Sequence, residues 1–187
     1  MECNKFKHLI NKSNVMKRII LIMLLAFGVF SIVPAQEMFT QGSMHIHGDV
    51  YDVRVNDDVS IIGVSNLSKN KKDIPKLKKE IVRDLLPIKE GDIKLDTAKE
   101  REIVLDILFN KKEILKSNKE AIGIRYIFYP NGQIMNIDFV LMKATVITPA
   151  EISAIDRCLR KEIKASFSGE EYKSFPVIPY SKKWLVF

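Results

Sequence analysis

The sequence predicts an α+β fold in two layers, an antiparallel sheet with helices packed on one face. Three observations lead to this prediction. Alternating apolar residues flank a turn signal at Pro130-Asn131-Gly132, which is typical of a β-hairpin. A helix signal follows at Thr148, and a last apolar run at 184–187 indicates a closing strand. Residues 121–187 are therefore expected to form a ββαβ unit.

Residues 1–35 are expected to precede the fold as a secretory signal peptide, cleaved before Gln36. A basic pair leads into an apolar run at 19–32, and small residues follow at the cleavage positions. Met16 is the expected initiator, after an over-called start. The run is shorter than the about 20 residues of a transmembrane helix, and the alternative is an uncleaved anchor. No Cys lies near the cleavage point, which excludes a lipoprotein.

Charge and cysteine content argue against nucleic-acid binding and against a disulfide framework. The whole chain carries 30 basic and 23 acidic residues, and removal of the leader lowers the net charge from +7 to +3. That is an ordinary solvated surface. Cys3 leaves with the leader, so Cys158 is alone and is expected to be a small buried hydrophobe. About 150 residues remain, which suits a single domain spanning 36–187.

The N-terminal part of that domain is expected to be a second hairpin over residues 43–64. Apolar residues alternate along it, and Asn56-Asp57-Asp58 interrupts the alternation as a turn. A polar loop follows at 65–72. It is the candidate hinge between this N-terminal hairpin subregion and the rest of the domain.

Two helices are expected next. Asp73 can cap the first, and Pro87 ends it. The second is expected from Thr97, because apolar residues up to Leu115 follow helical spacing. Within it, a strand over 103–109 remains an open alternative.

The central hairpin has two candidate registers. With Asn131-Gly132 as a two-residue loop, four apolar pairs face one another: 128 with 135, 126 with 137, 124 with 139, and 122 with 141. A three-residue loop with Gly132 in a bulge suits the turn chemistry and shifts the pairing by one. The apolar pattern decides which face is buried, because a slipped register would expose the whole set.

The helix after the hairpin begins with a complete set of start signals. Thr148 can cap it, Pro149 takes the first position, and Glu151 can close a capping box. Gly169 is the expected stop. The apolar stripe is Ile152, Ile155, Leu159 and Ile163, with Cys158 beside it. The polar face is expected to carry Glu151, Asp156, Arg157, Arg160, Lys161 and Lys164.

The hairpin also carries a family resemblance. Its second strand reads Asn131-Gly132-Gln133-Ile134-Met135-Asn136-Ile137-Asp138-Phe139, with an alternating strand before it and a helix and final strand after it. Over about residues 122–187 this resembles the periplasmic C-terminal domain of TonB. The resemblance implies the ββαβ order, a periplasmic location and a partner that adds a strand to a sheet edge. The chain is also similar to small secreted proteins of uncharacterised families from didermal bacteria.

His45-x-His47 is the candidate metal motif. Residues two apart on a strand project to one face, so both imidazoles could reach one ion, with Asp49 or Asp52 adding a carboxylate. A metal site needs three or four ligands, and solvent-facing strand histidines are the expected reading. The paired acids Asp57-Asp58 and Glu170-Glu171 fall in expected loops, where they are solvated. No cofactor is expected.

These observations predict an exported, non-enzymatic binding or accessory protein of the bacterial envelope, periplasmic or secreted, without a stable membrane span after cleavage. Its expected partner is another envelope protein, bound by β-augmentation at Trp184, Leu185, Val186 and Phe187. Nucleic acid is not expected. One alternative is a small secreted hydrolase or metal-dependent enzyme that uses His45 and His47. Another is a purely structural envelope protein.

Overall fold

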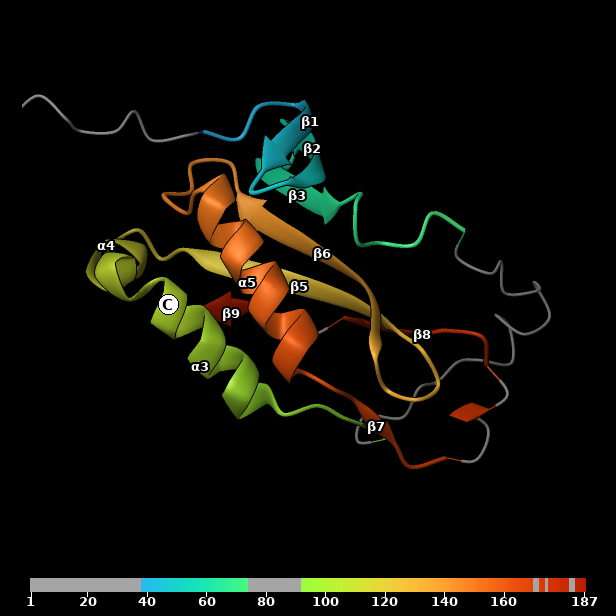
Figure 1. Ribbon diagram of the computed structural model, residues 1–187. Helices are drawn as coiled ribbons and strands as arrows, with labels where there is room; N and C mark the ends of the chain where they lie inside the picture. The colour runs from blue at the N-terminus through green and yellow to red at the C-terminus, as the bar shows by residue number, and fades with distance from the viewer. Residues whose placement is uncertain (1–37, 74–91, 170–171, 174, 182–183) are drawn as a thin grey trace, which may run out of the picture. The chain divides into compact units, whose positions relative to one another are not determined.

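The computed structural model describes residues 38–73, 92–169, 172–173, 175–181 and 184–187 (Figure 1). The expectations for the signal peptide and for the first helix lie outside these residues, apart from Asp73. Residues 37–187 form one compact unit. The described elements are β1 (Gly42–Ile46), β2 (Asp49–Asn56), β3 (Ile61–Asn66), β4 (Ile93–Lys94), α3 (Thr97–Ile107), the 3₁₀ helix η2 (Phe109–Lys111), α4 (Lys112–Ser117), β5 (Ala121–Phe128), β6 (Ile134–Met142), α5 (Pro149–Glu162), β7 (Ser166–Phe167), β8 (Ile178–Ser181) and β9 (Leu185–Val186).

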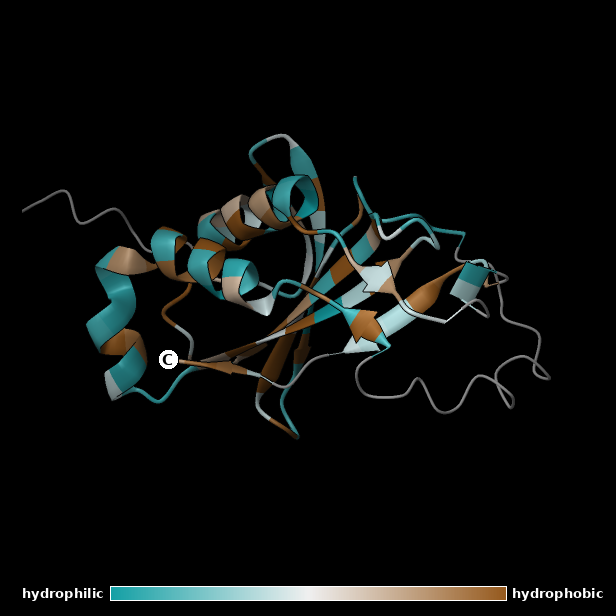
Figure 2. Cartoon of the chain, turned by 90° about the horizontal axis from the view of Figure 1, so that it is seen from below, coloured by the Kyte–Doolittle hydropathy of each residue, from teal (hydrophilic) through white to brown (hydrophobic). Residues whose placement is uncertain are grey.

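The predicted α+β class is confirmed. The main sheet is antiparallel in the order β1-β2-β3-β6-β5-β8, with β9 also paired to β5, and β4 pairs with β7 separately. The helices α3 and α5 pack on each other and cover one face of the sheet (Figure 1). Figure 2 shows apolar and hydrophilic residues alternating along these helices, as expected where each helix buries one side.

The N-terminal subregion differs from the single predicted hairpin. It is a three-stranded meander, because a two-residue turn at His47-Gly48 separates β1 from β2. His47 has φ 49° and Gly48 has φ 86°, and positive φ at both turn positions matches the twist of a tight hairpin. The second turn, at 57–60, follows the predicted Asn56-Asp57-Asp58 signal. Sequence reasoning missed the first turn because His-Gly is a weaker turn signal than Asn-Gly.

The predicted hinge at 65–72 is wrong. Ser65 and Asn66 are the last residues of β3, and β3 pairs with β6 from Ile61↔Met142 to Ser65↔Asp138. The meander and the C-terminal hairpin are therefore parts of one continuous sheet. A hinge is ruled out because ladder hydrogen bonds cross between the two regions.

The central hairpin combines the loop of one candidate register with the strand pairing of the other. The loop is the three-residue one, since Tyr129 N donates to the Gln133 carbonyl and Gly132 N to the Tyr129 carbonyl. The pairing then shifts at a bulge between Ile127 and Phe128, and beyond it the apolar pairs match as the pattern predicts. One predicted pair changes, because Phe128 lies opposite Ile134. The eight apolar side chains are buried: Ile122, Ile124, Tyr126, Phe128, Met135, Ile137, Phe139 and Leu141.

The stretch 103–109 is helical rather than a strand. Asp96 caps α3 by accepting from Lys99 N, and Ile103 and Val104 point into the core. Leu108 ends α3, and Phe109 begins η2. The apolar residues from 103 to 115 do not follow a single helical spacing, because η2 separates α3 from a new helix, α4, that contains Leu115.

The start of α5 agrees with prediction, and its end does not. Both bonds of the capping box form between Thr148 and Glu151. The helix ends at Glu162, seven residues before the predicted stop at Gly169. Ile163 is extended, and Ala165 N donates to the Gly132 carbonyl at 2.9 Å. The chain leaves the helix early because it docks on the hairpin loop and then continues into β7.

Replacing Gly132 with alanine is expected to destabilise the fold by about 3 kcal/mol. Gly132 has φ 82°, and a Cβ there would lie 1.9 Å from the carbonyl oxygen of Ala165. Backbone strain and overpacking each cost about 1–3 kcal/mol. The measurement is the unfolding free energy from urea denaturation.

Gly48→Ala is the matched control for this variant. Gly48 also has positive φ, but nothing lies within 4 Å of its Cβ position. It should lose only the strain part, about 1 kcal/mol. Equal losses for the two variants would show that contact with Ala165 does not constrain the hairpin loop.

Candidate functional site

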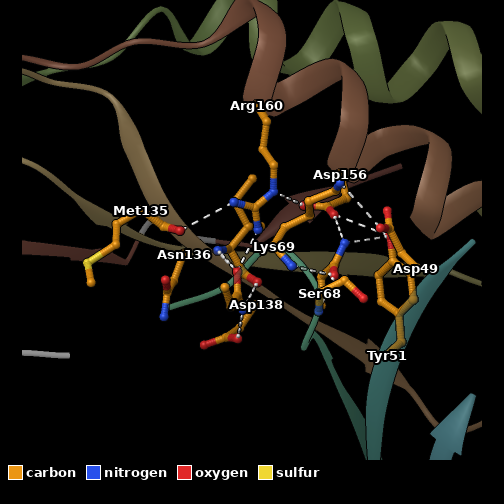
Figure 3. Close-up of polar contacts among 12 residues, drawn as sticks. Asp49, Tyr51, Ser68, Lys69, Met135, Asn136, Asp138, Asp156 and Arg160 are labelled. Atoms are coloured by element: carbon orange, nitrogen blue, oxygen red, sulfur yellow. Dashed lines mark hydrogen bonds and ion pairs between the residues drawn. The ribbon is translucent and has the colours of Figure 1, made fainter. Parts of the chain in front are cut away.

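A buried carboxylate under α5 organises the polar part of the interior (Figure 3). The Asp156 side chain is 0% exposed. Its Oδ2 accepts from Asn66 Nδ2 at 2.6 Å and from the Tyr51 hydroxyl at 3.2 Å, and its Oδ1 accepts from Arg160 Nε at 2.8 Å. We call Tyr51, Asn66, Asn70, Asp156 and Arg160 the Asp156 network. The expectation that Asp156 faces solvent on the polar side of the helix is wrong.

Arg160 extends this network to the hairpin bulge. Its Nη1 donates to the Met135 carbonyl at 3.3 Å, and its Nη2 donates to Asn70 Oδ1. The amide of Asn70 also bonds both backbone groups of Ile137, at 3.0 Å each. Asn70 therefore supplies side-chain partners to β6, as a neighbouring strand would.

Asn136, the residue before Ile137, also bonds a distant backbone through its side-chain amide. Its side chain accepts from Lys71 N at 2.8 Å and donates to the Lys71 carbonyl at 3.2 Å. Leu67 N donates to the Val50 carbonyl, and Val50 N to Ser68 Oγ. The polar loop after β3 is thus fixed to α5, β6 and β2, which is a second reason why it is no hinge.

Burial changes the acidity of Tyr51. The pKa of this phenol is raised to about 12, mainly by burial. The nearby Asp156 carboxylate contributes to the rise, and the Ser153 hydroxyl opposes it. Tyr126 is a second buried phenol. Its pKa is also raised, first by burial and then by Glu100, to which it donates at 2.7 Å.

A depression with many cationic side chains lies where α5 meets the β1–β2 turn. Its volume is about 620 Å³, and it is lined by His47, Gly48, Asp49, Lys69, Arg157, Arg160 and Lys161. We call it the basic depression. Lys69 Nζ lies 3.5 Å from Asp49 Oδ1, and Arg160 pairs with Asp156. Neither Arg157 nor Lys161 has an ion pair with another described residue.

The structure separates the two histidines of the candidate metal motif. His45 is within β1, opposite Val50, whereas His47 is in the turn with a left-handed backbone. The alternative in which both imidazoles share a strand face and reach one ion is therefore wrong; both histidines are exposed, but only His45 is on a strand. In the ranges that the structure describes, no group of three or more His, Cys, Asp and Glu side chains could hold a metal. His47 instead contributes to the basic depression.

The remaining sequence candidates lie apart from the depression. Asp57 is exposed and pairs with Lys143, and Asp58 is exposed as well. Glu170 and Glu171 lie outside the described residues. Cys158 is a free, half-buried thiol that packs against the core rather than within it.

The predicted partner-binding edge lies at one end of β5 and shares that edge of the sheet with β8. Leu185 and Val186 make β9 and pair with Ile122 and Ala121 of β5. Phe187 N donates to the Glu120 carbonyl at 3.2 Å. Leu185 and Phe187 pack against the core, and Trp184 is 43% exposed and Val186 56% exposed. Within 184–187, Leu185 and Phe187 therefore pack inward, whereas Trp184 and Val186 face solvent.

Trp184 lies on the sheet face opposite the helices. A Cβ built on Gly123 would lie 3.5 Å from its indole and 3.4 Å from Val140 Cβ. Gly123 and Val140 are paired across β5 and β6, and Ile61 faces the exposed Met142 one strand further along. We call Ile61, Val140, Met142, Trp184 and Val186 the outer patch. The sequence analysis missed this patch. Its signal was the pairs of apolar residues two apart, Val140 with Met142 and Trp184 with Val186, which a strand places on one face.

The neighbouring strand β8 is less suited to pairing with another chain. Pro179 lies within β8, opposite Ile127, and proline cannot donate a ladder hydrogen bond. The opposite edge is β1, five residues that include Ser43 and His45. Among the described helices, none combines the length and the hydropathy that crossing a membrane requires.

Comparison with known proteins identifies the fold. No protein-family model and no curated protein sequence matches the chain. The structure is similar to that of a DUF5043 family protein from Bacteroides uniformis ATCC 8492, with a TM-score of 0.65 and 15% sequence identity. The match covers 81% of this chain and 89% of that chain. At this identity the likeness shows a shared α+β fold, and it assigns no enzymatic activity.

Replacing Asp156 with alanine should destabilise the protein by about 3 kcal/mol, because it leaves Arg160, Asn66 and Tyr51 without their acceptor. Amide exchange at residues 67–71 should accelerate at the same time. The measurements are urea denaturation and hydrogen exchange. Asp52→Ala is the control, since Asp52 forms a surface pair with Arg54 and should change stability by less than about 1 kcal/mol. Equal losses of stability in the two variants would show that the Asp156 network does not stabilise the fold.

Stability should fall at alkaline pH through Tyr51. The folded pKa is raised to about 12 from 10.0, so the stabilisation from the neutral phenol is complete below pH 10 and is lost as pH rises toward 12. The denaturation midpoint, measured from pH 9 to 12, should drop more steeply in the wild type than in Tyr51→Phe. Parallel curves would show that Tyr51 ionises normally in the folded protein.

Proposed function

We propose that this chain is an exported, non-enzymatic binding protein of the bacterial envelope, which contacts another protein through its C-terminal sheet edge and the outer patch. The observation that carries the proposal is the position of Trp184. A large aromatic side chain lies exposed on the open face of the sheet, next to exposed Val186 and Met142. Aromatic residues in such a setting are typical anchors of protein interfaces.

Export is supported by the sequence. Residues 1–35 have the basic, apolar and small-residue regions of a cleaved signal peptide. The resemblance of residues 122–187 to the periplasmic C-terminal domain of TonB also supports a periplasmic location, although β7 and β8 lie between α5 and the closing strand instead of the simple ββαβ order. The proposed compartment is therefore the periplasm or the cell exterior.

The partner chemistry follows from the edge itself. Trp184 and Val186 alternate with residues that pack inward, so an added strand would meet their side chains on the open face. Arg101 Nη1 lies 3.5 Å from the Val186 carbonyl, the limit of a hydrogen bond, which an incoming N–H could replace. An extended apolar segment of another envelope protein, bound by β-augmentation, fits this arrangement.

The proposal is tested by site-specific crosslinking in the native envelope. A photo-reactive residue in place of Val186 should give a discrete crosslinked species, and Trp184→Ala should weaken that species at least about tenfold. The control position is Leu67, which is 39% exposed in the loop after β3, a strand that β6 separates from β5. Crosslinks of equal yield from both positions, or monomer alone from both, would contradict the proposal.

A further inference from the structure

We propose that the basic depression is a binding site for a phosphoryl group, carried at the end of a larger ligand. The lining comes from three separate segments. His47 is supplied by the β1–β2 turn, Lys69 by the loop after β3, and Arg157, Arg160 and Lys161 by α5. This site is independent of the outer patch, because α5 covers the other face of the sheet.

The charge balance of the depression favours an anion. Four cationic side chains face two carboxylates, those of Asp49 and Asp156. Lys69 offsets the first and Arg160 the second. Arg157 and Lys161 then remain without an ion pair among the described residues. Since they are four apart on one helix face, their side chains are neighbours.

Arg160 supplies a fixed point at the floor of the depression. Its side chain is 17% exposed and is held by Asp156, Asn70 and the Met135 carbonyl. These contacts use one N–H on each of its three nitrogens, and a guanidinium has five. The second N–H on Nη1 and on Nη2 has no acceptor in the described part of the chain. A guanidinium that is already oriented loses little entropy when it binds an oxyanion.

This arrangement suits a phosphoryl group better than a carboxylate. Two unpaired cations at neighbouring positions match the double charge of a phosphate monoester, and its three terminal oxygens can accept from several donors at once. A carboxylate carries one charge and would leave the second cation unmatched. The depression is open and faces solvent on α5, so the phosphoryl group can belong to a larger molecule that remains mostly outside.

The test uses the mature chain and pyrophosphate as the soluble probe. Titration followed by ¹H–¹⁵N NMR should shift the amides of Gly48, Lys69 and residues 157–161. Arg157→Gln with Lys161→Gln should weaken binding at least about tenfold, since each lost charge-assisted contact is worth about that factor. Both side chains are exposed on α5, so the variant should fold, and circular dichroism checks that it does.

The matched control is Lys112→Gln with Lys116→Gln. These two lysines are also exposed and four apart, on α4, and are absent from the depression. Their removal lowers the net charge equally, so binding should change less than about twofold. Equal weakening in both double variants would show nonspecific attraction and overturn the site. Absence of amide shifts would overturn it as well.

A second arm distinguishes the source of the phosphoryl group. Vesicles of phosphatidylcholine with phosphatidylglycerol are compared with vesicles of phosphatidylcholine alone, in sedimentation with the wild type and both double variants. Pyrophosphate binding without vesicle binding indicates a soluble phosphorylated ligand. Vesicle binding that depends on phosphatidylglycerol and on Arg157 and Lys161 assigns a lipid headgroup. Vesicle binding that both double variants retain would contradict the site.

Discussion

The burial of Asp156 is the constraint on which the arrangement of the domain depends. A carboxylate without water is tolerated only when hydrogen bonds surround it, and here the donors come from β2, from the end of β3 and from the next turn of α5. Those elements must keep their positions for the charge to remain satisfied. The same contacts hold Arg160 beneath the basic depression, so a structural requirement also orients the group proposed to meet the phosphoryl ligand.

A second constraint arises at the hairpin loop, where two local preferences conflict. Pro130-Asn131-Gly132 favours a three-residue loop, and the apolar pattern requires pairing as if the loop had two. The bulge near Phe128 resolves the conflict by taking up one residue. Beside that bulge, Arg160 donates to the Met135 carbonyl. Asn70 bonds both backbone groups of Ile137, just past the point where the pairing of β3 with β6 stops at Asp138. The hairpin and the Asp156 network are thus stabilised by the same contacts.

The two proposed surfaces lie on opposite faces of the sheet and differ in chemistry. The outer patch is apolar and adjoins a short edge strand, whereas the basic depression is cationic and framed by α5. A protein partner on one face would leave the other accessible. A carrier that binds a phosphorylated ligand and docks on an envelope protein would use both.

The sequence by itself determined the elements that rest on local rules. The capping box at Thr148, the helix start at Thr97 and the turn at Gly132 were all readable because neighbouring residues form them. The tertiary structure alone decided that Asp156 is buried, that the loop after β3 is fixed, and that α5 ends at Glu162. Each of these depends on a partner far away in the chain, as Asn66 is from Asp156, and one-dimensional periodicity carries no signal for such contacts. His47 and Arg157 illustrate the same limit, since only folding brings them to one depression.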